Sequence, residues 1–137
     1  MKTGSLFLIP VPLGDTPPET VLPPTVRELA ASLTHFVAEN AKSARAFLKA
    51  LPASTPLQQI EIQELNEHTP AATVRSLLAP LLAGHDMGLI SEAGCPAVAD
   101  PGALLVAEAH AAGIRIMPCI GPSSLLLALM GSGLSGQ

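Results

Sequence analysis

Short apolar runs alternate with segments of helical periodicity five times along this chain of 137 residues. The apolar runs are residues 5–11, 35–39, 57–65, 86–91 and 114–120, and the helical patterns occupy 25–33, 40–51, 71–84, 102–113 and 122–133. This alternation is typical of a parallel sheet, because parallel strands need a long crossover connection. The pattern therefore predicts one α/β, Rossmann-like domain with about five mostly parallel strands and helices on both faces. Ile60 and Ile62 alternate with polar residues, which predicts a half-exposed edge strand.

Several residues in this pattern are typical of helix ends. Asn40 is a predicted N-cap, and the pairs Thr69–Pro70 and Asp100–Pro101 each combine a capping residue with proline at the first helical position. Gly113 is expected to end the helix that Asp100 opens. Pro80 is expected to kink the helix over 71–84, because proline lacks the N–H that an interior helical position needs.

Charge and cysteine content limit the classes of function. Acidic residues outnumber basic ones by 11 to 7, and the formal net charge is −4, so the chain lacks the basic stripe typical of nucleic-acid binders. Cys95 and Cys119 have neither CxxC nor Cys/His spacing, so we expect no metal site and interpret them as reduced thiols of a cytoplasmic protein. No apolar stretch approaches the ~18 residues of a membrane span, so no membrane partner is expected.

Three stretches rich in glycine, proline and small residues follow predicted strands, at 10–15, 91–102 and 120–124. Ligands of open α/β sheets bind at the carboxyl ends of the strands, and small residues there let the backbone approach a ligand closely. Together the stretches predict a binding site, although ordinary turn chemistry would favour the same residues at any one of them. Neither G-x-G-x-x-G nor the P-loop pattern occurs, so a dinucleotide or nucleoside triphosphate is not favoured.

The chain resembles the tetrapyrrole methylase superfamily of S-adenosylmethionine-dependent methyltransferases in three segments, SLFLIPVPLGD (5–15), GLISEAGCPAVADPGALLV (88–106) and GIRIMPCIGPSSLLLALMGSGL (113–134). The branch that it resembles most is the ribosomal RNA small subunit methyltransferase I type, which 2′-O-methylates a cytidine of 16S RNA. The segments span the chain in the family's order. The resemblance implies a methyltransferase with S-adenosylmethionine as cofactor and RNA as acceptor.

In this superfamily, the cofactor lies between two α/β domains and is held largely by the backbone of these loops. By position, the resemblance implies cofactor contacts from Leu13, Gly14, Glu92, Ala93, Gly94, Cys95, Pro96, Ser123 and Ser124. Glu92 could instead stabilise its loop, and the two serines could cap the last helix. Cys95 is not expected to be a nucleophile, because the sulfonium of the cofactor is already an activated methyl donor.

Glu39 is the candidate catalytic residue, a general base that would accept the proton of an attacking hydroxyl. The alternative is a solvated acid at a helix start, where the helix dipole favours it. The RNA-methylating branch usually shows Ala-Glu-Asp-Thr-Arg here, whereas residues 38–42 read Ala-Glu-Asn-Ala-Lys. This departure leaves open a small tetrapyrrole or corrinoid acceptor, or a non-catalytic ligand-binding relic of the fold.

The resemblance also implies a second domain of similar size. Residues 1–137 would then be the N-terminal domain, with the C-terminal domain absent from this chain. Because both domains would hold the cofactor, we expect this chain to bind it weakly and to be inactive alone. Contact with ribosomal RNA would belong to the full-length protein, and family members are commonly dimers, which implies a homodimer.

Overall fold

The computed structural model describes residues 2–52, 55–98 and 101–136. Its strands are β1 (Leu6–Ile9), β2 (His35–Ala38), β3 (Glu61–Glu64), β4 (Met87–Ile90) and β5 (Ile116–Pro118). They form one sheet in the order β3-β2-β4-β1-β5, and every neighbouring pair is parallel. The predicted α/β, Rossmann-like class is therefore confirmed, and β3 lies at the edge of the sheet as its alternating pattern predicted.

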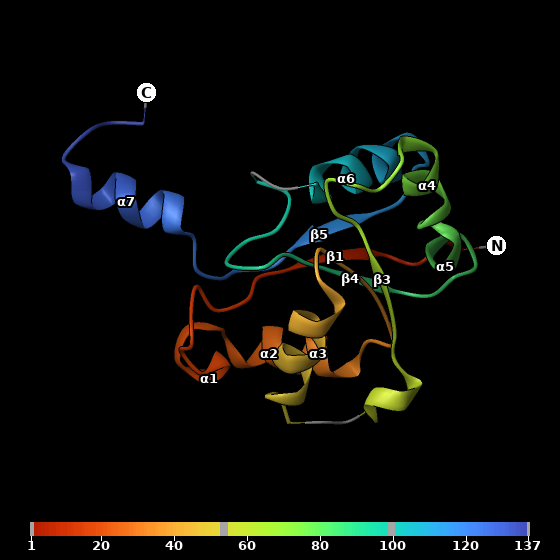
Figure 1. The fold of residues 1–137 in the computed structure, drawn as a ribbon, viewed down its shortest axis with the longest axis horizontal. Coiled ribbons are helices and arrows are strands. Elements are labelled where there is room, and N and C mark those ends of the chain that lie inside the picture. Colours follow the sequence, from red (N-terminus) through yellow and green to blue (C-terminus); the bar gives the residue numbers. More distant parts are fainter. Residues whose placement is uncertain (1, 53–54, 99–100, 137) are drawn as a thin grey trace.

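Helices cover both faces of this sheet, as predicted (Figure 1). One face carries α1 (Pro18–Val21), α2 (Pro24–Ser32) and α3 (Ala41–Lys49), and the opposite face carries α4 (Ala71–Ser76), α5 (Ala79–Leu82) and α6 (Gly102–Ala111). Each face has its own apolar cluster, because successive side chains of a strand point to opposite sides. In β2, for example, Phe36 belongs to the cluster under α2 and α3, whereas Val37 belongs to the one under α4 to α6.

Gly88 of β4 makes room for the aromatic ring in the first of these clusters. A Cβ atom at Gly88 would lie 2.7 Å from Cδ1 and Cε1 of Phe36 and 2.9 Å from Cδ1 of Ile9. Phe36 pairs with Gly88 in the register of β2 and β4, and its side chain is 1% exposed. The absence of a side chain at Gly88 therefore makes room for the large ring of Phe36 at the centre of the sheet.

Four local expectations differ from the structure or fall outside it. Thr69 is not an N-cap: its hydroxyl accepts the backbone N–H of Asn66, and Pro70 precedes α4 without a side-chain cap. The helix expected over 71–84 is two helices, since the chain leaves α4 at Leu77 and restarts at Ala79, with Pro80 in the first turn of α5. The first part of 57–65 is a 3-10 turn, Leu57–Gln59, rather than strand. The predicted cap Asp100 lies outside the described residues.

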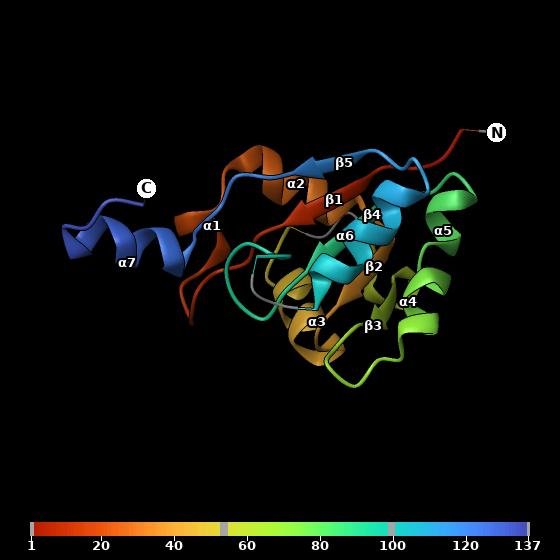
Figure 2. The ribbon, with the colours of Figure 1, turned by 90° about the horizontal axis from the view of Figure 1, so that it is seen from above.

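The last helix, α7 (Ser124–Ser132), projects away from the sheet, as the two views in Figures 1 and 2 show. Ser123 is its N-cap, with Oγ accepting the backbone N–H of Leu126 at 3.4 Å, and Gly133 ends it at a φ of +78°. The exposed apolar side chains of this segment are Leu125, Leu126, Leu127, Leu129, Met130 and Leu134. A helix with so many apolar side chains is normally buried, so α7 presents an uncovered apolar surface.

Candidate functional site

The three loops that the sequence singled out meet at the carboxyl ends of the strands. Val11 and Gly94 form an antiparallel bridge with N–H···O distances of 3.1 and 3.0 Å, which joins the loops after β1 and β4. The thiol of Cys95 lies 3.3 Å from the carbonyl oxygen of Pro122, which ties in the loop after β5. The edge of the sheet therefore carries one connected rim, formed by residues 10–15, 91–98 and 119–123.

Gly94 is the point at which these loops come closest. Its φ is +70°, and a Cβ atom there would lie 3.0 Å from Cδ2 of Leu13 and 3.1 Å from the carbonyl oxygen of Pro122. Ala97, in the same loop, has a φ of +65°, which an L-residue adopts only at a cost of about 1 kcal/mol or more. Ser91 is 8% exposed and its hydroxyl donates to the carbonyl oxygens of Ala93 and Gly94. The backbone of this loop is thus held in an unusual path by its own hydrogen bonds.

Cys95 has the chemistry of a partly buried, protonated thiol and not of a nucleophile. Burial raises the pKa of the Cys95 thiol above its ordinary value, so the group stays protonated at neutral pH. The protonated thiol donates to the carbonyl oxygen of Pro122, and the carbonyl oxygen of Gly121 lies 3.7 Å away. The thiol of Cys95 therefore links the loop after β4 to the loop after β5.

A cavity of about 630 Å³ opens beside this rim, between the loop after β1, α3 and the loop after β4. Its apolar wall includes Phe47 and Ile90, and the acidic side chains that line it are Asp15, Glu19 and Glu92. The part of the lining that the structure describes contains no lysine or arginine. Its size is that of a small-molecule site, and its charge favours a ligand with a cationic group.

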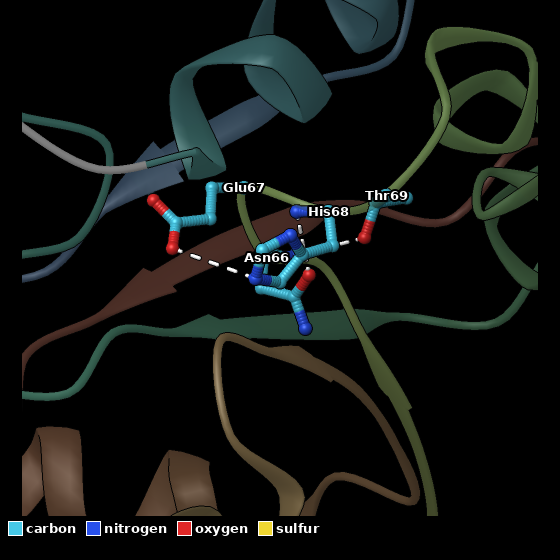
Figure 3. A network of polar contacts seen from close by, with 4 residues as sticks. All are labelled: Asn66, Glu67, His68 and Thr69. Carbon is cyan, nitrogen blue, oxygen red and sulfur yellow. Dashed lines mark hydrogen bonds and ion pairs between the residues drawn. The ribbon is translucent and has the colours of Figure 1, made fainter.

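A second cavity, of about 490 Å³, lies at the same edge of the sheet, and Glu92 lines both. Its other lining residues are Glu39, Asn40, Asn66, Glu67, His68 and Pro101. Figure 3 shows the segment from Asn66 to Thr69 folded on itself: Asn66 Oδ1 accepts the N–H of His68 at 2.9 Å, and Nε2 of His68 lies 3.6 Å from Oε1 of Glu67. These contacts fix the side of the cavity that follows β3.

The first turn of α3 connects the two cavities. Asn40 is the N-cap, as predicted, and its Oδ1 accepts the backbone N–H of Ser43 at 3.0 Å. The Oγ of Ser43 donates to Oε2 of Glu92 at 3.3 Å. Since Asn40 lines the second cavity and Ser43 the first, a single helical turn spans the wall between them.

The residues singled out from the sequence fall into three groups. Gly14 and Glu92 line the first cavity. A second group meets at the rim, where Gly94 and Cys95 lie close to the side chain of Leu13 and the backbone of Ser123. Ala93 and Pro96 belong to the same loop as Gly94, and Ser124 begins α7. Glu39 lines only the second cavity. The structure thus gathers the three loops as expected and places Glu39 beside the loop after β4, where it shares the second cavity with Glu92.

Sequence reasoning missed Ser43 and Glu19 as lining residues, and it included Asp15 only as the last residue of the stretch 10–15. Asp15 and Glu19 flank the proline-rich stretch 16–18, which could have identified them as part of the loop after β1. Ser43 carried no such signal, because its contact with Glu92 joins residues 49 positions apart. Among the described residues, no group of three or more histidine, cysteine or acidic side chains is placed to hold a metal ion, and no helix is long and apolar enough to cross a membrane.

Comparison with known proteins identifies relatives of one kind, although no family model matches the chain. The chain is 34% identical over 131 residues to ribosomal RNA small subunit methyltransferase I of Xylella fastidiosa, which covers 96% of this chain and 45% of the relative. It is 33% identical over 132 residues to the protein of the same name from Synechocystis, covering 96% and 44%. With that of Mesorhizobium japonicum it shares 48% identity over 69 residues, half of this chain. The chain therefore spans about 45% of the length of the first two relatives.

Proposed function

Because the chain belongs to the tetrapyrrole methylase family, in its ribosomal RNA small subunit methyltransferase I branch, we propose that it supplies one half of an S-adenosylmethionine-dependent methyltransferase that acts on ribosomal RNA. The observation that carries this proposal is the meeting of three loops beside an acid-lined cavity at the carboxyl edge of the sheet. The names of the relatives favour RNA over a tetrapyrrole acceptor. They likewise favour an enzyme over a non-catalytic relic.

The first cavity fits the methyl donor in size, polarity and charge. When bound, S-adenosylmethionine supplies an activated methyl group on a positively charged sulfur. Phe47 and Ile90 offer an apolar wall for a flat base, and Asp15 and Glu19 offer carboxylates to positively charged groups. The backbone of Leu13, Gly14 and residues 93–96, together with Ser123 and Ser124, would complete the contacts on this side.

Alignment is the main task of such a site, because methyl transfer requires the acceptor oxygen, the methyl carbon and the sulfur to lie in line. We assign the acceptor to the second cavity, where Glu39 would accept the proton of its hydroxyl. A general base of this kind typically contributes 10²–10⁴-fold in rate. With a net charge of −4, this chain alone attracts RNA phosphates little, so RNA binding is assigned to the whole protein.

The uncovered apolar surface of α7 supports the hypothesis that this protein has a second half. The first relatives are more than twice as long as the matched region, and α7 exposes 62% of Leu126 and 78% of Met130. We propose that the second half packs on α7 and closes the first cavity, so that residues 1–137 form the N-terminal domain. The homodimer implied by the resemblance stays a prediction, which sedimentation of the two-domain protein would check.

Equilibrium dialysis with radiolabelled S-adenosylmethionine tests the proposal. The 137-residue chain is expected to bind at least tenfold more weakly than the full-length relative from Xylella fastidiosa, because one wall of the proposed site would be missing. Methyl transfer to small ribosomal subunits is expected from the relative and not from the chain alone. Equal affinities would refute the divided site, and transfer by the two-domain protein to tetrapyrrole precursors in place of ribosomal subunits would refute the RNA acceptor.

A further inference from the structure

Glu92 occupies the boundary between the two cavities. It follows β4 directly after Ser91, and its side chain contributes to the lining on both sides. A ligand in the first cavity and a ligand in the second would therefore meet the same carboxylate. No other residue is shared between the described linings of the two cavities.

Ser43 holds this carboxylate in place. Its Oγ donates to Oε2 of Glu92 at 3.3 Å, and its own backbone is fixed by the cap from Asn40 at 3.0 Å. A second bond anchors the same turn, since Oε2 of Glu64 on the edge strand accepts the N–H of Ala41 at 2.8 Å. The carboxylate of Glu92 is thus attached to a turn that is itself tied to the sheet.

The charge of Glu92 has no cation beside it within the cavities. The other charged groups in the described lining of the first cavity, Asp15 and Glu19, are also acidic. In the second cavity they are Glu39 and Glu67, with His68 paired to Glu67. The carboxylate of Glu92 therefore attracts a positively charged ligand group at this boundary, whereas a neutral group of the same shape gains no such electrostatic stabilisation.

We propose that Glu92, positioned by Ser43, is a specificity-determining residue that distinguishes the methyl donor from its demethylated product by charge. The inference rests on the proposed function. S-adenosylmethionine carries a positive sulfonium, and S-adenosylhomocysteine has a neutral thioether in the same place. Loss of the methyl group therefore removes the partner of Glu92 and favours release of the product.

Binding of the two compounds to the 137-residue chain tests this selection. Titration of the ¹⁵N-labelled chain with each compound, followed by amide chemical shifts, measures millimolar affinities and shows from the same spectra that each variant is folded. The chain is expected to prefer S-adenosylmethionine about fivefold at low salt, the effect of one partly screened charge pair. Added salt is expected to reduce the preference.

Three variants and a matched control make the test specific. Glu92→Gln is expected to bring the ratio of the two affinities to about one. Ser43→Ala is expected to give an intermediate ratio. Ser43→Thr is expected to keep the wild-type ratio, because threonine retains the hydroxyl. Glu28→Gln removes an exposed acid of α2 that lines neither cavity and should leave the ratio unchanged. If both compounds bind and Glu92→Gln keeps the preference, this inference is wrong and the proposed function stands. If neither compound binds the wild-type chain at millimolar concentration, the inference is overturned, and the proposed function is decided separately by methyl transfer from the full-length relative to small ribosomal subunits.

Discussion

Replacing Gly88 by alanine tests whether the missing side chain in β4 is what accommodates the ring of Phe36. The added Cβ would lie 2.7 Å from two carbons of that ring, whereas carbon atoms in favourable contact are about 3.5–4.0 Å apart. The overlap is therefore about 0.8 Å or more, and it occurs in the centre of the sheet. The neighbouring atoms belong to side chains of Phe36 and Ile9, so the structure relaxes in part and does not reject the substitution outright.

Overpacking of this kind destabilises a domain by about 1–3 kcal/mol. At a size of 137 residues that corresponds to a fall in Tm of roughly 3–9 °C. Phe36→Leu alone should also destabilise, because it removes buried apolar atoms. The double variant Gly88→Ala/Phe36→Leu should lose less than the sum of the two single changes, since the new methyl group enters the space that the ring has left.

Urea unfolding followed by far-ultraviolet circular dichroism measures all four members of this cycle. Gly131→Ala is the matched control, because a Cβ at this helical glycine meets no atom within 4 Å, and the change should be neutral or mildly stabilising. Additive effects in the double variant would refute the reasoning. Unchanged stability of Gly88→Ala itself would show that the register of β2 and β4 is not as described.

Three further changes probe the rim and its supports. Asn40→Ala removes the cap of α3 and should lower the free energy of unfolding by about 1 kcal/mol in the same urea assay. An unchanged free energy of unfolding would contradict this role of Asn40. Gly94→Ala forces an alanine to a φ of +70° at 3.1 Å from the carbonyl oxygen of Pro122, and a loss of about 1–2 kcal/mol is expected. Because burial raises the pKa of the Cys95 thiol, its alkylation by iodoacetamide, measured by mass spectrometry, should be slower than that of glutathione at pH 7.5 and accelerate only at alkaline pH. If Cys95 is alkylated as fast as glutathione at neutral pH, the raised pKa of its thiol is contradicted.

The strands and their direction could be predicted because apolar runs and helical segments alternate along the chain, and a parallel sheet is the usual outcome of that pattern. The gathering of residues 10–15, 91–98 and 119–123 followed from the same reasoning, since the carboxyl ends of parallel strands share one edge. Local hydrogen bonding was harder to predict. Thr69 looked like a cap, but its hydroxyl accepts the backbone N–H of Asn66 in the folded turn, and α4 has no side-chain cap.

The wall between the two cavities could not be read from the sequence. Contact between Ser43 and Glu92 depends on β2 lying beside β4, and the order of strands across a sheet is not encoded in their order along the chain. The same lateral order separates Glu39, which follows β2, from the loop after β1. Residue type identified Glu39 and Glu92, and only the arrangement of strands determined which cavity each of them lines.

The position of β1 in the sheet has a consequence for synthesis on the ribosome. β1 is translated before the other four strands of this sheet, yet its neighbours are β4 and β5, and its register with β4 joins Leu6 to Met87 and Ile9 to Ile90. At a translation rate of about 5–20 residues per second, several seconds pass between the synthesis of β1 and that of β4, the first strand with which β1 can pair. During that interval the apolar residues 6–9 are unpaired and exposed, whereas β2 and β3 can pair as soon as residue 64 has left the exit tunnel.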